Sequence, residues 1–511
     1  MSGLNLKPLT LVCSALLSAA AHAAPPKDET PRLLEKMNAR LEQLEKRNAE
    51  LEKQVRANAQ PVAQGLEERL RTLEDTQAKV TRGLDSDGIS ENEPELTYRL
   101  KAIEKEALAF KKSAKKIDAL DGLQAGMSLT TIAQRPNGLP QGTAHGSSQL
   151  NYRADVTVEL PLTPIGDTEH KIFAHFRIGQ GQGLNAAMTA LGAFATTPNT
   201  AAFRASGATP DDSVAILGQA WYQASIPLPV GGFKPLSREK LELTFGKMDL
   251  FGFFDQNAAT SDEGRQFLNS AFVHNPLLDA GRQIGVDANG FQPGFVASYL
   301  NETSKPQTWR LSLGVFGSGP KGSNYQSSLA SPLVMAQAET SLKLFGGLTG
   351  NYRAYLWQRS KGLELDDVTE ARHSGWGLSV DQRIGDGLTL FGRYGQQISG
   401  HVRFDRSLTL GGEISGSYWA RGGDSIGIAA GLLRTSDVFQ ATGDSGDLDG
   451  DGIADFAYTP GGSEKLAEIY YRYRITKQFE LSPNFQYIAR VGGNPNAAVV
   501  KILGLRAQLT F

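Results

Sequence analysis

Apolar and polar residues alternate over most of this chain, from about residue 123 to the last residue. The alternation is clear in the segments LNYRADVTVELPL, HKIFAHFRIG and KLELTFGKMDLF, and it continues to the terminal segment ILGLRAQLTF. A period of two is typical of β-strands, because successive side chains of a strand point to opposite faces. The pattern therefore predicts that the C-terminal part of the chain is all β.

The polar face of these strands favours a membrane barrel over a soluble β-sandwich. In the segment AEIYYRYRITKQFELSPNFQYIAR, a hairpin expected to turn at 476–478, one face is apolar and the other carries Glu468, Arg472, Arg474, Glu480, Ser482, Asn484, Gln486 and Arg490. A soluble sandwich that buried this second face would leave its charged side chains unpaired in an apolar core. A closed barrel avoids this by turning its apolar face to lipid and its polar face to a water-filled lumen.

Length and turn signals give the expected size of the barrel. Residues 123–511 are enough for about 16 strands, or 18, at roughly 24 residues for each strand and its connection. Gly385-Asp386-Gly387 predicts a tight hairpin, whereas 179–213 and 437–463 read as long loops. Short turns that alternate with long loops are typical of outer-membrane barrels, which carry their short turns on the periplasmic side. Phe511 would end the last strand in the aromatic girdle at that side.

The segment before residue 123 has a helical period instead. A heptad seam with charged outer positions is formed by Leu34, Met37, Leu41, Leu44, Asn48, Leu51 and Val55. This spacing predicts a coiled coil, in which a polar residue at the a position of Asn48 fixes register. A single amphipathic helix packed on another domain is the alternative. Since neighbouring barrels in a membrane are parallel, the seam predicts a parallel homo-oligomeric stem in the periplasm, and we favour a trimer.

The first 23 residues have the features of a secretory signal peptide. Lys7 supplies the positive start, an apolar stretch follows, and Ala21-His22-Ala23 forms a small-x-small cleavage site. Cys13, the single cysteine of the sequence, lies inside this signal. The sequence thus divides into a signal peptide (1–23), a helical stem with linkers (24–122) and an outer-membrane barrel (123–511).

Charge and composition exclude several functional classes. The 52 Lys and Arg residues nearly balance the 54 Asp and Glu residues, whereas a nucleic-acid-binding protein would be basic. No apolar run reaches about 18 residues, so the sequence offers no transmembrane helix. The seven histidines are scattered and no Ser/His/Asp set stands out, so nothing indicates an enzyme.

Several segments resemble a known family of porins. The segments AHFRIGQGQGLN, LTFGKMDLFGFFDQN and QFLNSAFVHN, together with the last 44 or so residues, are similar to the carbohydrate-selective outer-membrane porins of the OprB type. This resemblance covers about residues 123–511 and leaves out the N-terminal heptads. It implies a passive channel for sugars and other small polar solutes, and it brings no catalytic residues. A terminal Phe on an alternating strand also resembles the signal by which outer-membrane assembly machinery recognises its clients, which gives Phe511 a second expected role.

Charged residues on the inner face are the candidates for lining the pore. Alternation places Arg177, Arg353, Arg393, Arg472 and Arg474 there, and facing charges tune the selectivity of a channel. Each of them could equally be one half of an ion pair in the wall. A loop that begins with FGFFDQN is expected to fold inward and form a constriction from Phe253, Phe254, Asp255, Asn257 and Asn269. Its aromatic rings could stack on sugars while Asp and Asn bind hydroxyl groups; an ordinary girdle followed by an outer loop is the alternative.

The segment DLDGDGIAD near the end of the chain resembles a calcium-binding loop. Its acidic residues follow the spacing of an EF-hand, with a glycine at the turn: Asp447, Asp449, Asp451, Gly452 and Asp455. Tyr458 stands where an EF-hand has its bidentate Glu, so the loop is expected to bind Ca²⁺ weakly. A flexible acidic loop without metal is the alternative.

These observations together predict an outer-membrane porin of a Gram-negative bacterium for passive diffusion of carbohydrates and small polar solutes. Two other functions stay open at this point. Inward arginines could make the channel prefer anions, and the stem could make the protein a tether to the peptidoglycan with the barrel as its anchor. The expected partners are small solutes, outer-membrane lipids and the assembly machinery, with no nucleic acid.

Overall fold

The computed structural model describes most of the C-terminal part of the chain and little of the N-terminal part. The described residues are 35, 38–50, 53, 71, 122–140, 143, 146–192, 196–203, 213–229, 237–278, 290–317, 328–366, 368–443, 446–447, 452 and 458–511. Contacts divide the chain into two units, Met1–Ala114 and Lys115–Phe511. In the first unit, residues 38–50 are helical and exposed. The expected signal peptide and most of the heptad seam lie outside the described residues.

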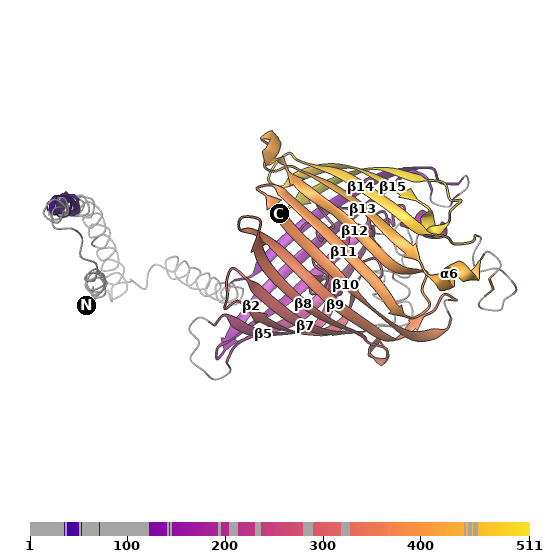
Figure 1. Cartoon of the computed structure of the whole chain (residues 1–511), viewed down its shortest axis with the longest axis horizontal. Helices are drawn as coiled ribbons and strands as arrows, with labels where there is room; N and C mark the ends of the chain where they lie inside the picture. The colour runs from indigo at the N-terminus through magenta and orange to yellow at the C-terminus, as the bar shows by residue number, and fades with distance from the viewer. Residues whose placement is uncertain are drawn as a thin grey trace, which may run out of the picture. The chain divides into compact units, whose positions relative to one another are not determined.

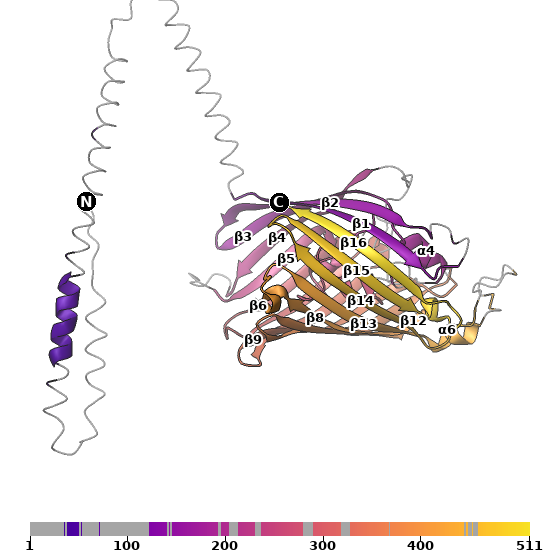
Figure 2. The same ribbon diagram turned by 90° about the horizontal axis from the view of Figure 1, so that it is seen from above.

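The second unit is a closed antiparallel barrel (Figures 1 and 2). In the part of the chain that the structure describes, its strands are β1 (Gln124–Asn137), β2 (Gln149–Ile165), β3 (Thr168–Gln180), β4 (Val214–Pro227), β5 (Glu239–Asp249), β6 (Phe291–Asn301), β7 (Thr308–Phe316), β8 (Leu333–Leu344), β9 (Leu348–Leu363), β10 (Glu370–Gly385), β11 (Leu388–Ser399), β12 (Phe404–Ser415), β13 (Ser425–Thr435), β14 (Ser463–Arg474), β15 (Phe479–Ala489) and β16 (Val500–Thr510). This confirms the smaller of the two expected strand counts. Every strand pairs with its neighbours in sequence, and β1 pairs with β16 to close the ring.

The connections differ at the two ends of the barrel. One end has short turns, such as Asp386-Gly387 between β10 and β11 and 475–478 between β14 and β15, where the sequence predicted them. The other end carries the long connections and α6 (Asp437–Thr442), opposite the end at which the chain terminates (Figures 1 and 2). We call these the short-turn end and the long-loop end. Among the described residues, no helix is long and apolar enough to cross a membrane.

Exposure alternates along the strands as a lipid-facing barrel requires. On β16, Leu503 is 62% exposed and Leu505 is 48% exposed, whereas the next inward residue, Arg506, is 1% exposed. The outward positions are apolar because they meet hydrocarbon. The inward positions are polar, and many are buried because other parts of the chain pack against them inside the barrel.

The connection between β5 and β6 enters the lumen and fills part of it. It contains the 3₁₀ turn η1 (Leu250–Gly252) and the short helix α5 (Ser270–Val273). Its side chains form an apolar cluster with inward residues of the wall, including Phe254, Phe267, Phe272, Tyr355 and Tyr470. We call the described part, residues 250–278, the inner loop. The remaining short helical elements are α4 (Asn185–Ala190), η3 (Ser328–Ala330), η4 (Gly416–Trp419) and η5 (Val491–Gly493).

Candidate functional site: a charged eyelet beside the inner loop

The inner loop is fastened to the wall by a buried ion pair. The carboxylate of Asp255 accepts hydrogen bonds from Arg393 Nε on β11 (3.2 Å), from the Tyr355 hydroxyl on β9 (3.0 Å) and from the backbone N–H of Asn275 (2.7 Å). Arg393 also donates to the carbonyl oxygen of Phe272 at 2.5 Å. Both charged side chains are almost fully buried, at 1% and 0% exposed. Such a pair is stable only when hydrogen bonds replace the lost water, as they do here.

A second attachment holds the middle of the inner loop against β14 and β16. Glu468 accepts the backbone N–H groups of Leu268 (2.8 Å) and Asn269 (2.9 Å). Arg506 donates to the carbonyl oxygens of Gln266 (2.8 Å) and Arg265 (2.5 Å). An irregular segment has backbone groups that no strand satisfies, and these two charged side chains satisfy several of them. The inner loop is thereby fixed to this part of the wall as well as to β9 and β11.

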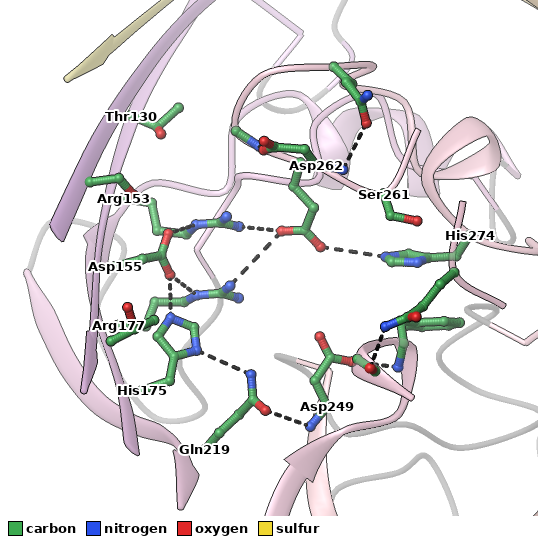
Figure 3. Close-up of a pocket in the computed structure, with 18 of the residues that line it drawn as sticks. Thr130, Arg153, Asp155, His175, Arg177, Gln219, Asp249, Ser261, Asp262 and His274 are labelled. Atoms are coloured by element: carbon green, nitrogen blue, oxygen red, sulfur yellow. Dashed lines mark hydrogen bonds and ion pairs between the residues drawn. The ribbon is translucent and has the colours of Figure 1, made fainter. Parts of the chain in front are cut away.

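Strands β2 and β3, two and three places around the ring from β16, carry a ladder of charges. Asp155 lies at its centre and accepts hydrogen bonds from Arg153 Nε (2.8 Å) and Arg177 Nε (2.8 Å). The ring of His175 approaches the same carboxylate, with Nε2 at 2.8 Å. Strand register explains this cluster, since Asp155 pairs directly with Arg177 on β3. Figure 3 shows Arg153, Asp155, His175 and Arg177 together on one side of the cavity.

The inner loop presents acidic residues to this ladder across a cavity of about 760 Å³. Glu263 reaches Arg153 Nη1 at 2.9 Å and lies 3.9 Å from Arg177 Nη2. His274 approaches Glu263 at 3.5 Å and stacks on Phe251 with ring centroids 3.7 Å apart. In Figure 3, Asp262 and His274 lie across the cavity from the ladder. We call the cavity between the ladder and the inner loop the eyelet.

Glu263 keeps its negative charge although it is surrounded by protein. Burial by itself would raise the pKa of Glu263, but the positive charges of Arg153 and Arg177 and the hydrogen bond from His274 outweigh it. The net result is a pKa well below the usual glutamate range. The eyelet is therefore lined by fixed positive and negative groups that lie next to one another, which is an arrangement suited to binding neutral molecules with many hydroxyl groups.

The expected pore-lining arginines occupy four different environments. Arg177 and Arg353 line the eyelet cavity, and Arg353 is paired there with Glu339 and Asp381, each at 2.9 Å. Arg393 is buried beneath the inner loop. Arg472 lies 3.7 Å from Glu413 in the wall, and Arg474 is 40% exposed at the short-turn end, where it donates to turn carbonyls.

The residues expected at the constriction mostly anchor the inner loop. Phe254 and Asp255 are buried against the wall, and Asn269 caps α5 by accepting from Ala271 N–H and donates to Gln486. Asn257 lines the eyelet and also donates to the carbonyl oxygen of Val380 at 3.0 Å. Phe253 is half-buried beside Trp221 on β4, with ring centroids 5.9 Å apart.

Of the remaining sequence candidates, the structure describes Asp447 and Phe511, which lie at the two ends of the barrel. Asp447 is described and accepts a hydrogen bond from the Gly452 N–H at 2.8 Å, but Asp449, Asp451 and Asp455 lie outside the described residues. Phe511 exchanges backbone hydrogen bonds with Met127 on β1, and its ring is 65% exposed.

Several eyelet residues were not among the sequence candidates. Arg153 and Asp155 stand on the inward face of a strand whose alternation is as clear as that of β3, so the pattern that selected Arg177 would also have found them. Glu263 and His274 had no comparable signal, because the inner loop has no repeating period.

Comparisons with known proteins agree with this architecture. The family model of the carbohydrate-selective porin, OprB family, matches residues 166–511. A high-pH structure of Pseudomonas putida OprB is similar over 78% of this chain and 97% of its own length, with a TM-score of 0.58 and 19% sequence identity. A low-pH structure of the same protein gives a TM-score of 0.42 at 16% identity, covering 78% of this chain and 96% of that one. A mutant porin of Rh. blastica gives 0.40 at 10% identity, covering 76% of this chain and all of its own. No curated protein matches the sequence.

The closed barrel, its lipid-facing exterior and its polar, loop-narrowed lumen define an outer-membrane porin, a channel rather than an enzyme. Because the family model matches more than half of the chain, this protein belongs to the OprB family of carbohydrate-selective porins. The short-turn end of such a barrel faces the periplasm and the long-loop end faces the exterior.

Proposed function

We propose that sugars cross this channel one at a time through the eyelet, where their hydroxyl groups bind to the arginine ladder and to Glu263 beside it. The observation that supports this proposal is the Arg153–Glu263 pair, which places donors and an acceptor side by side on the lining of one cavity. A sugar hydroxyl both donates and accepts, so it can bind to both residues at once. Charge-assisted hydrogen bonds of this kind are stronger than neutral ones.

The pairing of the arginines favours sugars over anions as the main solutes. Arg153 and Arg177 share Asp155, and Arg353 is held between Glu339 and Asp381. Neutralised arginines give little net attraction to an anion, while their remaining N–H groups can still bind hydroxyl oxygens. A dense field of fixed charges of both signs also disfavours passage of a charged solute.

Liposome swelling with the purified full chain tests this function. We expect rapid entry of glucose and slower entry of gluconate, a solute of similar size that carries a charge. The variants Arg153→Gln and Glu263→Gln should lower the rate of glucose entry by about tenfold, because each removes a charge-assisted hydrogen bond. Arg372→Gln is the matched control, since Arg372 is exposed at the long-loop end. A channel that conducts ions but admits no sugar would contradict the proposal.

The N-terminal residues 24–122 are proposed to form a parallel stem in the periplasm that links several barrels. The heptad seam supports this proposal, and the described part of it, 38–50, is helical. Light scattering in detergent should give a trimer for the full chain and a smaller assembly after removal of 24–118. A monomeric full-length protein would leave the stem free to contact peptidoglycan or another partner instead.

We further propose that the acidic loop at 447–458 binds Ca²⁺ at the outer surface. The EF-hand spacing of Asp447, Asp449, Asp451 and Asp455 supports it. Ca²⁺ should protect the loop from protease in the unmutated protein and not in the double variant Asp449→Ala, Asp451→Ala. If chelation leaves cleavage unchanged in the unmutated protein, the loop does not depend on calcium.

Phe511 is proposed to act as the assembly signal read by the outer-membrane insertion machinery. Its position at the end of β16, with an exposed ring, supports this role. Deleting Phe511 should lower the amount of heat-modifiable barrel in outer-membrane fractions. If the amount of folded barrel is unchanged by the deletion, Phe511 is not part of the assembly signal.

A further inference from the structure

Three aromatic side chains form a cluster in the lumen, and none of them is among the residues that line the eyelet. Phe173 on β3 and Trp221 on β4 are direct cross-strand partners, and their rings are stacked with centroids 4.7 Å apart and planes 22° apart. Phe253 of the inner loop meets Trp221 edge-on at 5.9 Å. We call these three residues the aromatic platform.

Strand parity places Phe173 and Trp221 on the lumen side of the wall. Phe173 has the same parity as His175 and Arg177 of the charge ladder, whereas the neighbouring Ile172 and Phe176 are 42% and 44% exposed on the lipid side. Trp221 likewise shares the face of Gln219, whose amide approaches the His175 ring. Aromatic residues on the outer face would belong to a membrane girdle, but an inward pair has no lipid to contact.

The aromatic platform lies on the periplasmic side of the eyelet. β3 leaves the short-turn end at Thr168 and reaches Phe173 before it reaches His175 and Arg177. A solute moving inward from the eyelet therefore passes the platform next. The platform is half-buried rather than sealed in the core.

Polar groups surround the platform on the same wall. The indole N–H of Trp221 donates to Gln219 Oε1 at 3.2 Å, and the Lys171 ammonium lies over the indole ring at 5.6 Å. Lys171 is in turn paired with Glu159 at 3.1 Å, and both side chains are about one-third exposed. The residue paired with Trp221 on β5 is Gly246, so that position contributes no side chain beside the indole.

We infer that the aromatic platform is a second carbohydrate subsite, at which the C–H face of a pyranose ring packs against the exposed part of the stacked Trp221–Phe173 pair; this inference rests on the proposed sugar passage through the eyelet. A pyranose has an apolar face and a polar rim of hydroxyls, and an aromatic surface edged by Lys171, Glu159 and Gln219 matches both parts. An open-chain alditol such as sorbitol carries a comparable set of hydroxyl groups without a fixed flat face. The platform should therefore distinguish ring sugars from linear polyols, which hydroxyl binding at the eyelet does less well.

Two consecutive weak sites would also help a sugar to leave the eyelet. A channel conducts well when each site binds strongly enough to admit the solute and weakly enough to release it to the next. Stacking on the platform can replace part of the hydrogen bonding that a sugar loses as it moves away from Arg153 and Glu263. The platform thus speeds the release of the sugar from the eyelet toward the periplasm.

The test compares glucose with sorbitol in liposomes that contain the full chain. Trp221→Leu and Phe173→Leu should each lower the ratio of glucose to sorbitol entry by about threefold to tenfold, the range expected for losing one aromatic contact. Single-channel conductance of salt should change little, because the charges of the eyelet remain. The matched controls are Trp309→Leu and Phe176→Leu, whose side chains are 38% and 44% exposed on the outer face and should leave the ratio unchanged.

Three results would overturn the inference. The ratio could stay constant in both platform variants, glucose and sorbitol entry could change together, or the outward controls could lower the ratio as much as the platform variants do. Trp221→Phe keeps an aromatic face and should retain most of the ratio, which separates stacking from mere filling of space even if Trp221→Leu folds poorly. Failure of the proposed function has a different signature, since glucose would then not enter through the unmutated channel at all.

Discussion

Arg177 and Arg393 are both inward-facing arginines of the barrel wall, yet they have different surroundings. Arg177 lines the eyelet and its side chain is 13% exposed, whereas Arg393 is 1% exposed and fixed beneath the inner loop. The inner loop passes on one side of the lumen, so it turns that side into a protein core and leaves the other side as a channel. Strand alternation decides whether a side chain points inward, and the inner loop decides what it meets there.

Removing Arg393 should have the largest effect, because the packed side of the lumen would lose its buried ion pair. In Arg393→Leu the carboxylate of Asp255 is left buried without its cation, at a cost of about 3–5 kcal/mol. We expect the inner loop to detach, single-channel conductance to rise severalfold, and discrimination between sugars to be lost. Planar-bilayer recordings and limited proteolysis of the inner loop measure this.

The control for Arg393 is Arg406→Leu, since Arg406 is an exposed residue of β12. The double variant Asp255→Leu, Arg393→Leu should recover part of the loop protection, because it leaves no unpaired charge. Unchanged conductance in Arg393→Leu would show that the buried ion pair does not hold the inner loop in place, and so that this side of the lumen is not a packed core.

Arg177→Gln should produce a smaller effect of another kind. Arg177 belongs to the open side, where Asp155 keeps Arg153 and His175 as partners after the change. The inner loop should stay protease-resistant while glucose entry falls by about tenfold, through loss of a charge-assisted hydrogen bond. Loss of loop protection in this variant would place Arg177 in the packed side instead.

Arg153→Gln should make the eyelet sensitive to pH. In the unmutated protein the lowered pKa of Glu263 keeps it ionised as the pH falls through the usual carboxylate range. Stabilisation from a lowered pKa is present above the unfolded-state pKa and is lost only as the pH falls through the folded-state pKa. Without the positive charge of Arg153, less opposes the effect of burial, and the pKa of Glu263 rises. Glu263 then loses its negative charge at a higher pH, and the stability that this charge contributes to the folded protein is lost at that pH as well.

The reversal potential in a salt gradient, followed from about pH 7 to about pH 4, measures this change in the eyelet charge. It should shift more steeply with acidification in Arg153→Gln than in the unmutated channel. Identical pH profiles for the two proteins would contradict the assigned electrostatic role of Arg153.

The smallest effect is expected from Arg474→Gln at the periplasmic rim. Arg474 is 40% exposed, and its guanidinium lies 3.7 Å from the carboxylate of Glu480. Such a long contact with a partly exposed side chain contributes no more than about 1 kcal/mol, and Glu480 keeps Arg265 as a partner at 3.6 Å after the change. Glucose entry and denaturation temperature should both stay close to those of the unmutated protein. A large fall in glucose entry would instead indicate that the solute passes close to Arg474 at this rim.

Much of the barrel was predictable because its rules are local. Alternation and turn residues gave the strands, and the length of the segment gave their number to within one hairpin. The turn at Asp386-Gly387 followed from its glycines, and the change from helical to strand periodicity marked the start of β1 near Leu123. These features depend on neighbours in sequence, which the sequence shows directly.

The site was less predictable because it depends on contacts between distant residues. The sequence predicts Phe254 and Asp255 at a constriction, but an isolated loop sequence does not show whether such residues face a solute or the wall. Asp255 meets Arg393, which lies 138 positions away, and Glu263 meets Arg153, 110 positions away. No periodicity links the members of either pair, so only the folded chain brings them together.

The pairing of β1 with β16 has a consequence for the synthesis and export of the chain, before it is inserted into the membrane. Ser128 pairs with Thr510, and Met127 exchanges backbone hydrogen bonds with Phe511, so the last part of the barrel to be synthesised is the partner of the first. Until β16 exists, β1 presents an open edge that can join any other strand. A nascent chain must therefore be kept apart from its copies until translation ends, and a prematurely terminated one can never close its ring. Such unfinished chains should be substrates for periplasmic chaperones and proteases.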